Sequence, residues 1–598
     1  MGDPISSRQR DRLRYLPWAV TSALLVVVLY ASVRLGIGRT PYRSVEILIV
    51  PCLTLLFMAP ALALANIVPD EAYTWLSASG SNRRFQRLWS GLLVAGMLLV
   101  IWFVFGDALH AQWGMIDDQE IMSFLVPDGK LDLGEIPAML MRTEVGAWGH
   151  YPRFRPAYFF LRMLETAFWG KNPTLWYGCR LAMIAAAVLA FWKLASPRMG
   201  KLGAALLCLN TLSFPYWVEY VGRLGPSETY VVVGLPMYLA GVLVALRSEP
   251  SRAAMRALAC AAILIGSMVC IGSKENLLIL ALPSAYLMIR AARGKDWLLL
   301  GAAVGSLLFA AYVAGGILLS ASKTGLDIYD RPVALASRLA VILDVLRGRH
   351  YVTPFSMLIA QTAGVGALNL IPGLTQPQRR AVHCAAFWLA CLCGVYLSQM
   401  VFYNGRWPET ETRYGYPGLL YLPASIFILY GLGRDLLASS PSTSTLHVAL
   451  KASLSVSLAL VIGFHGSYSG TRETLRGNVA STREFTARFE RLVDQLRQDE
   501  ELQVVIESSD ILDYEPVFGY PRFLSAYQVR NPLFLRVSGY GPDSFPPGLF
   551  RRLAEELQVI SADGNDVYLP LASLDERPDR CLSLYLTSEY PSACTAFR

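Results

Sequence analysis

Two adjacent carboxylates follow one of the long apolar runs of this chain. Asp117 and Asp118 stand within Trp-Gly-Met-Ile-Asp-Asp-Gln-Glu at 113–120, shortly beyond an apolar run that ends near Phe105. An ionised carboxylate is costly in hydrocarbon, so a pair near a membrane interface requires water, a cation or a ligand. Such a pair can deprotonate an acceptor hydroxyl, or bind a divalent cation such as Mg²⁺ or Mn²⁺ together with a phosphate. The bland alternative is a solvated loop that caps the next helix.

Two arginines follow in the same polar segment. Arg153 and Arg155 flank Phe154, directly before Pro156 and a further apolar run. Arginine binds phosphate through two parallel hydrogen bonds and keeps its charge in poorly solvating surroundings. We therefore expect these arginines to bind the phosphate of a lipid. An interfacial anchor that only touches lipid headgroups is the alternative.

Other charged residues lie at the ends of later apolar runs, on the same predicted side of the membrane. The members expected to bind substrate are Glu228, Lys274, Glu275, Arg406 and Arg413. Their common sidedness predicts that they line one shared cavity. Considered singly, each of these residues is explained equally well as an ordinary charge in a loop or as one member of an internal ion pair.

The elements that position these residues are transmembrane helices. The 598 residues are 54% hydrophobic and only 16% charged. In soluble proteins about a quarter of all residues are charged. The apolar residues come in blocks of about twenty, the length that crosses a bilayer. The net charge of +8 comes from short basic loops, without the basic and aromatic tracts of a nucleic-acid binder. The composition predicts an α-helical multi-pass membrane protein with membrane lipids, and no nucleic acid, as partners.

The apolar blocks predict about thirteen transmembrane helices. They lie near 16–37, 45–67, 88–106, 176–196, 201–217, 229–247, 254–272, 276–292, 297–320, 351–371, 381–402, 414–433 and 447–466. Loops rich in arginine and lysine alternate with long polar loops, which places the long loops outside the cytoplasm. No Asn-x-Ser/Thr sequon in which x is a residue other than proline occurs, which favours a bacterial inner membrane over the secretory pathway.

This orientation divides the chain into four parts. Residues 1–106 form N-terminal spans, 107–175 a large extracytoplasmic loop with the acidic site, 176–466 a helical bundle, and 467–598 a small soluble α/β domain in the periplasm or its equivalent. In the last part, a helix is predicted at 480–500, where Ser481 and Glu484 form a possible capping box, and a strand at 502–506.

The C-terminal part also contains aromatic and cysteine residues of interest. Tyr514, Phe518, Tyr520 and Tyr527 are able to stack on sugars, although packing in a core is the commoner role of such residues. A disulfide between Cys581 and Cys594 is expected if this part lies outside the cytoplasm.

With these features the chain resembles the GT-C superfamily of integral-membrane glycosyltransferases. The resemblance rests on the many spans, the acidic residues in a large outer loop, arginines in a later outer loop, and a soluble C-terminal part. It implies that Asp117 or Asp118 acts as a base or metal ligand, and that Arg406 or Arg413 meets a lipid phosphate. The superfamily's acidic loop usually follows the first span, whereas here it follows the third predicted span.

The resemblance implies an inverting transfer of a sugar from a polyprenyl-phosphate donor to a glycan, lipid or protein acceptor on the outer face. Two alternatives stay open. A flippase or other transporter of lipid-linked saccharides would use the charged cavity without a base. A polysaccharide polymerase or ligase would use lipid-linked sugars as long chains.

Overall fold

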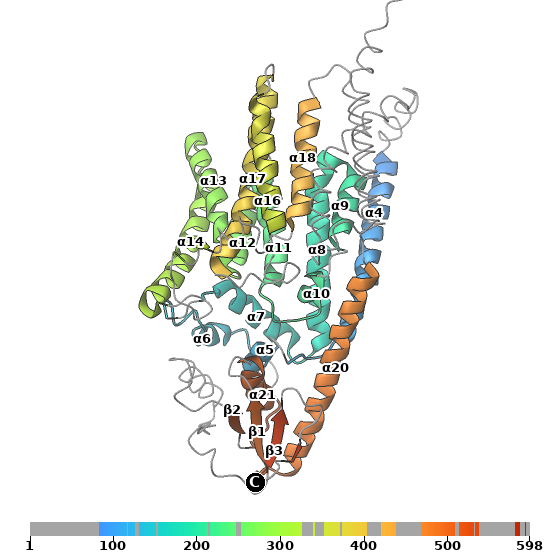
Figure 1. The fold of residues 1–598 in the computed structure, drawn as a ribbon, viewed down its shortest axis with the longest axis vertical. Helices are drawn as coiled ribbons and strands as arrows, with labels where there is room; N and C mark the ends of the chain where they lie inside the picture. The colour runs from blue at the N-terminus through green and yellow to red at the C-terminus, as the bar shows by residue number, and fades with distance from the viewer. Residues whose placement is uncertain are drawn as a thin grey trace, which may run out of the picture.

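The computed structural model shows a long helical bundle with an α/β region at one end (Figure 1). The residues described are 83–115, 118–125, 131–150, 153–212, 216–246, 253–325, 336, 339–340, 352–370, 374–403, 420–437, 468–508, 514–531, 533–537, 581–585 and 592–593. Six helices in these ranges are long and apolar enough to cross a membrane: Gln86–His110, Pro173–Met199, Glu228–Ala245, Ala253–Ile271, Glu275–Gly294 and Trp297–Lys323. The chain is therefore an integral membrane protein.

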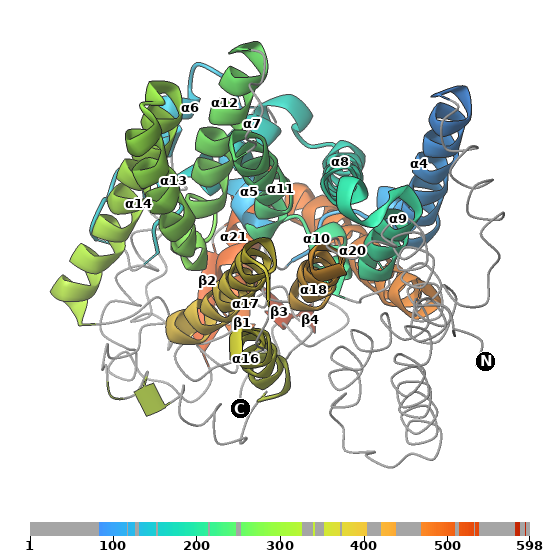
Figure 2. The ribbon, with the colours of Figure 1, turned by 90° about the horizontal axis from the view of Figure 1, so that it is seen from above.

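Each of these six segments overlaps one predicted span. They comprise α4 (Arg83–Phe105) with η1 (Gly106–His110), α8 (Pro173–Met199), α11 (Glu228–Ala245), α12 (Ala253–Ile271), η2 (Glu275–Leu280) with α13 (Ala281–Gly294), and α14 (Trp297–Thr324). Seen from above, α4 lies at one side of the bundle and α14 at the other, with α11 between them (Figure 2).

The predicted span at 201–217 stays a prediction. Within it the structure describes α9 (Lys201–Leu212) and α10 (Tyr216–Val221), and residues 213–215 lie outside the described residues. Twelve residues of α-helix rise only about 18 Å, which is well short of the hydrocarbon thickness of a bilayer.

Helices also occupy three of the later predicted spans. These are α16 (Val352–Ala367), followed by η3 (Leu368–Leu370), and then α17 (Gln376–Tyr403) and α18 (Tyr421–Leu437). The predicted spans at 16–37, 45–67 and 447–466 lie outside the described residues.

A layer of short helices lies between the bundle and the C-terminal region (Figure 1). It contains α5 (Gln119–Phe124), α6 (Ile136–Leu140) and α7 (Pro156–Trp169). Proline begins α7, where the missing N–H costs no helical hydrogen bond. Since these helices follow the polar segments singled out in the sequence, they position the candidate site.

The C-terminal region alternates helix and strand. It begins with α20 (Tyr468–Gln498), followed by β1 (Gln503–Ser508), α21 (Tyr514–Ala526), β2 (Leu533–Val537), β3 (Cys581–Tyr585) and β4 (Ser592–Ala593). The strand order is β2-β1-β3-β4. The central strand β1 is parallel to β2 and β3, and β4 is antiparallel to β3.

The capping-box prediction in this region is wrong, because α20 begins at Tyr468 and Ser481 lies inside the helix. Cys594 lies outside the described residues, so the disulfide with Cys581 stays a prediction.

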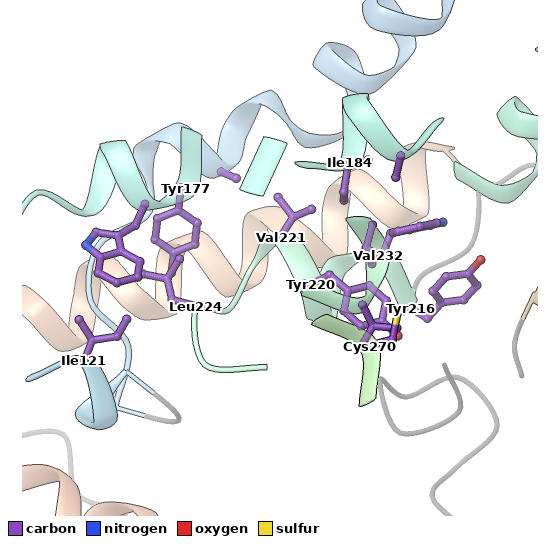
Figure 3. Close-up of a cluster of buried hydrophobic side chains, with 14 of the residues drawn as sticks. Ile121, Tyr177, Ile184, Tyr216, Tyr220, Val221, Leu224, Val232 and Cys270 are labelled. Carbon is purple, nitrogen blue, oxygen red and sulfur yellow. The ribbon is translucent and has the colours of Figure 1, made fainter. Parts of the chain in front are cut away.

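One hydrophobic cluster runs from the short helices into the bundle (Figure 3). Ile121 of α5 and Tyr177 of α8 belong to it, together with Val232 of α11 and Cys270 of α12, and all four are buried. The segment that carries Asp118 is thus continuous with the apolar core, which restricts how far its charged side chains can move.

Candidate functional site

The N-terminus of α7 is fixed to the turn that follows α12. The backbone N–H groups of Ala157 and Tyr158 both donate to the carbonyl oxygen of Gly272, over 2.9 and 3.1 Å. A Cβ at residue 272 would lie 2.6 Å from the Ala157 Cβ, so only glycine permits this approach. The contact brings Arg155, just before α7, beside Glu275, just after the turn.

Arg155 lies between two carboxylates. Its Nη2 is 3.5 Å from Glu144 Oε1, and its Nε is 3.8 Å from Glu275 Oε1. Burial lowers the pKa of the Arg155 guanidinium, but the two carboxylates outweigh it and hold the pKa above its usual value. Burial raises the pKa of the Glu144 carboxyl, and the charge of Arg155 only partly offsets this. Arg155 therefore belongs to an internal cluster of charges and is more than a headgroup anchor.

Glu228 and Lys274 form a second buried ion pair. Lys274 Nζ lies 2.5 Å from Glu228 Oε1, and the two residues are 7% and 2% exposed. Glu228 begins α11, whereas Lys274 precedes η2, so the pair joins two separate helices at their ends. A buried ion pair brings little net stability because desolvation offsets the attraction.

Asp118 is buried before the first turn of α5, with only 1% of its surface exposed. Its Oδ2 accepts a hydrogen bond from the backbone N–H of Gly114 over 2.7 Å, and its side chain makes no capping hydrogen bond to the helix. The alternative of a solvated, helix-capping loop is therefore wrong for Asp118. Asp117 lies outside the described residues.

Tyr158 joins the acidic segment to the charged turns. Its hydroxyl contacts the carboxylate of Glu120 in α5 and lies 3.0 Å from the carbonyl oxygen of Gly225, three residues before Glu228. Its ring lies under the Arg155 guanidinium, 4.8 Å from ring centre to Cζ. Carboxylates and cations from four separate segments thus surround the start of α7.

Of the predicted substrate-binding residues, Arg155, Glu228, Lys274 and Glu275 are brought to this region in buried ion pairs. Arg153 is half-buried and precedes Arg155 by two residues. Arg406 and Arg413 lie outside the described residues.

A network under α7 is absent from the sequence-based prediction. Arg180 of α8 donates to both carboxylate oxygens of Glu165, over 2.6 and 2.7 Å, and the Tyr230 hydroxyl donates to the same carboxylate over 2.5 Å. Burial raises the pKa of the Glu165 carboxyl, but the charge and hydrogen bonds of Arg180 outweigh it and leave the pKa below its usual value. An arginine inside an apolar run, as at Arg180, is the signal that identifies such a network.

Arg162 lies beside this network without a carboxylate of its own. It is fully buried, and none of its guanidinium nitrogens has a hydrogen-bond acceptor among the described residues. Its Cζ lies 5.2 Å from the ring centre of Tyr158, 5.6 Å from that of Trp176 and 5.8 Å from that of Tyr230. The aromatic faces stabilise the cation without neutralising it.

The described residues provide no ligand set for the divalent cation whose binding is one alternative role of the acidic pair. Among these residues, no three His, Cys, Asp or Glu side chains come close enough together to hold a metal ion. A role for Asp117 or Asp118 as metal ligands stays a prediction.

The comparisons with known proteins give a likeness in structure alone. No protein-family model and no curated protein matches the chain. Two crystal structures of ArnT from Cupriavidus metallidurans are similar to it. The structure in the apo state has a TM-score of 0.40 and 16% identity over 75% of this chain and 86% of ArnT. The structure bound to undecaprenyl phosphate has a TM-score of 0.31 and 14% identity over 75% and 85%. At these levels of identity and TM-score the likeness assigns no role to this chain or to any of its residues.

Proposed function

We propose that this protein is a membrane glycosyltransferase that transfers a sugar from a polyprenyl-phosphate donor to a glycan, lipid or protein acceptor on the outer face of a bacterial inner membrane. The observation that carries the proposal is the gathering of buried charges at the end of the apolar bundle that adjoins α7. Buried ion pairs such as Glu228–Lys274 are costly and bring little stability. Ionisable residues in such positions of membrane proteins mark the paths and sites of polar ligands.

The proposed chemistry is one displacement. Asp117 or Asp118 accepts the proton of an acceptor hydroxyl, whose oxygen attacks the anomeric carbon of the donor sugar. The bond between that carbon and the phosphate oxygen breaks, and the lipid phosphate leaves with the bonding electron pair. A single in-line displacement inverts the configuration of the anomeric carbon.

The cations around α7 supply the electrostatic part of this mechanism. Negative charge grows on the phosphate as the bond breaks, and preorganised cations stabilise it in a site of low dielectric constant. Arg155 and Lys274 are held in place by Glu144, Glu275 and Glu228, and this fixes their side chains before the donor binds. Arg153 and, in the later outer loop, Arg406 and Arg413 are further proposed phosphate ligands.

The transfer rate of aspartate variants tests this proposal. The purified protein is given a polyprenyl-phosphate sugar and an acceptor fraction, and the variants Asp117→Asn and Asp118→Asn are compared with the wild type. Loss of the general base is expected to lower the rate by about 10²- to 10⁴-fold in one of the two variants.

Asp132→Asn is the matched control, because Asp132 is an exposed aspartate of the same loop, and its rate is expected to equal that of the wild type. Full activity in both Asp117→Asn and Asp118→Asn proteins that insert normally would refute the assignment of the base.

A further inference from the structure

The backbone just before the two aspartates is held between α8 and the C-terminal helix α20. The N–H of Gln112 donates to Thr482 Oγ1 over 3.1 Å, and the carbonyl oxygen of Gln112 accepts from the Tyr177 hydroxyl over 3.2 Å. Thr486 Oγ1 donates to the carbonyl oxygen of Trp113 over 3.0 Å. Three polar groups of the backbone at Gln112 and Trp113 thus have side-chain partners from helices far away in the sequence.

The two threonines form one contact surface on α20. Thr482 and Thr486 are four residues apart, so they lie on the same face of the helix, and both are buried. Thr482 also packs against Gly114, where an added Cβ would lie 3.4 Å from the threonine Cγ2. Gly114 in turn donates its N–H to Asp118, so the contact with α20 is one hydrogen bond away from the candidate base.

A second contact comes from α21. This helix packs on α5 (Figure 1), and a Cβ at Gly519 would lie 2.7 Å from the Met115 Sδ. Beyond α7, Lys171 Nζ donates to the carbonyl oxygen of Ala526 at the end of α21 over 2.7 Å. The C-terminal region therefore contacts the acidic segment immediately before and immediately after Asp117 and Asp118.

We propose that Thr482 and Thr486 are positioning residues that hold the Asp117–Asp118 segment in the geometry needed for proton abstraction. This inference rests on the proposed function. Proton transfer requires the base within hydrogen-bonding distance of the acceptor hydroxyl, and the hydroxyls of α20 fix the backbone from which that base extends. The C-terminal region is thereby a part of the active site's framework, in addition to any contact with the acceptor.

The variants Thr482→Val and Thr486→Val test the inference, since valine keeps the shape of threonine and removes its hydroxyl. A displacement of about 1 Å in a reacting group lowers a rate by about 100-fold, so kcat of the double variant is expected to fall between about 10- and 100-fold. KM for the donor is expected to stay within about twofold, because the cations around α7 are untouched.

Two controls separate positioning from a general loss of structure. Thr482→Ser and Thr486→Ser keep the hydroxyls, so both are expected to keep the wild-type kcat. Thr474→Val alters an exposed threonine of the same helix and is expected to change neither constant. Wild-type kcat in the double valine variant, or an equal loss in the serine variants, would overturn the inference.

Hydrogen exchange gives a readout that does not need activity. The amides of 111–118 are expected to exchange faster in the double valine variant than in the wild type, while those of α11 stay unchanged. Unchanged exchange at 111–118 would show that the threonines do not hold this segment, whatever the enzyme does. Absence of transfer by the wild type, with faster exchange in the variant, would instead refute the proposed function and leave the contact intact.

Discussion

Two buried arginines, Arg162 of α7 and Arg180 of α8, both lie against the rings of Trp176 and Tyr230 but differ in their other partners. Arg180 is bound by both oxygens of Glu165, whereas the guanidinium of Arg162 lies against aromatic rings and has no hydrogen-bond acceptor among the described residues. Removing one partner of a buried ion pair leaves the other charge uncompensated, while removing Arg162 leaves no carboxylate without its partner. The two arginines should therefore respond differently to the same substitution.

We expect Arg180→Met to lower the free energy of unfolding by about 3–5 kcal/mol, and Arg162→Met to lower it by clearly less. Thermal unfolding of the purified variants in detergent provides the comparison. Equal destabilisation by both substitutions would mean that Arg162 has a charged partner as strong as that of Arg180.

Glu165 makes the stability of the protein depend on pH in a defined direction. Its pKa in the folded protein lies below the ordinary value of 4.5, so the folded state releases the proton more readily than the unfolded chain. The resulting stabilisation is complete above the unfolded pKa and is lost as the pH falls through the folded pKa. The melting temperature of the wild type is expected to fall below about pH 4.5 more steeply than that of Glu165→Gln, which has no such titration. Parallel pH profiles for the two proteins would contradict this.

At the scale of elements, one glycine decides how α7 meets the turn after α12. A methyl group at Gly272 would lie 2.8 Å from the Met268 carbonyl oxygen and 3.0 Å from the Ala157 nitrogen, and backbone atoms cannot move aside cheaply. Gly272→Ala is expected to destabilise the protein by about 1–3 kcal/mol and to lower transfer, since Arg155 and Glu275 move apart. Gly294→Ala is the matched control, because nothing lies within 4 Å of its Cβ position.

Helices could be predicted from the sequence where one local signal is enough to locate them. Apolar runs of membrane-spanning length predict α8, α12 and α14 at the correct places, because that signal is contained in the run itself. The run at 201–217 contains α9, which has only 12 residues in the described part of the chain, so its apolar length alone does not establish a span. The early start of α20 was missed because a polar amphipathic helix has no apolar block to mark it.

The sequence indicates which residues belong to the site, but it indicates less clearly which of them form ion pairs with one another. Glu228, Lys274 and Glu275 stand out as charges at the ends of apolar runs, but their partners are set by how the helices pack. The pairing of Glu165 with Arg180 joins residues of two helices, and no spacing in the chain announces it. Gly272 decides the position of Arg155 through a contact with Ala157, which only the packed structure reveals.

At the scale of the whole molecule, the charged site, the short helices and the C-terminal region all lie at one end of the bundle (Figure 1). We propose that this end faces the outside of the cell. A cysteine at the exposed position 132, introduced as Asp132→Cys in a protein without other cysteines, is expected to react with an impermeant maleimide only from the outer side of sealed vesicles. Reaction only from the cytoplasmic side would reverse the topology.

The central claim is that the protein breaks the bond between a sugar and a lipid phosphate. Mass spectrometry of the donor after incubation with the purified protein in liposomes and an acceptor fraction measures this directly. We predict one free polyprenyl phosphate for each sugar gained by the acceptor, and no such product with the Asp117→Asn/Asp118→Asn double variant. An intact donor that moves to the opposite leaflet without cleavage would contradict the claim and identify a transporter.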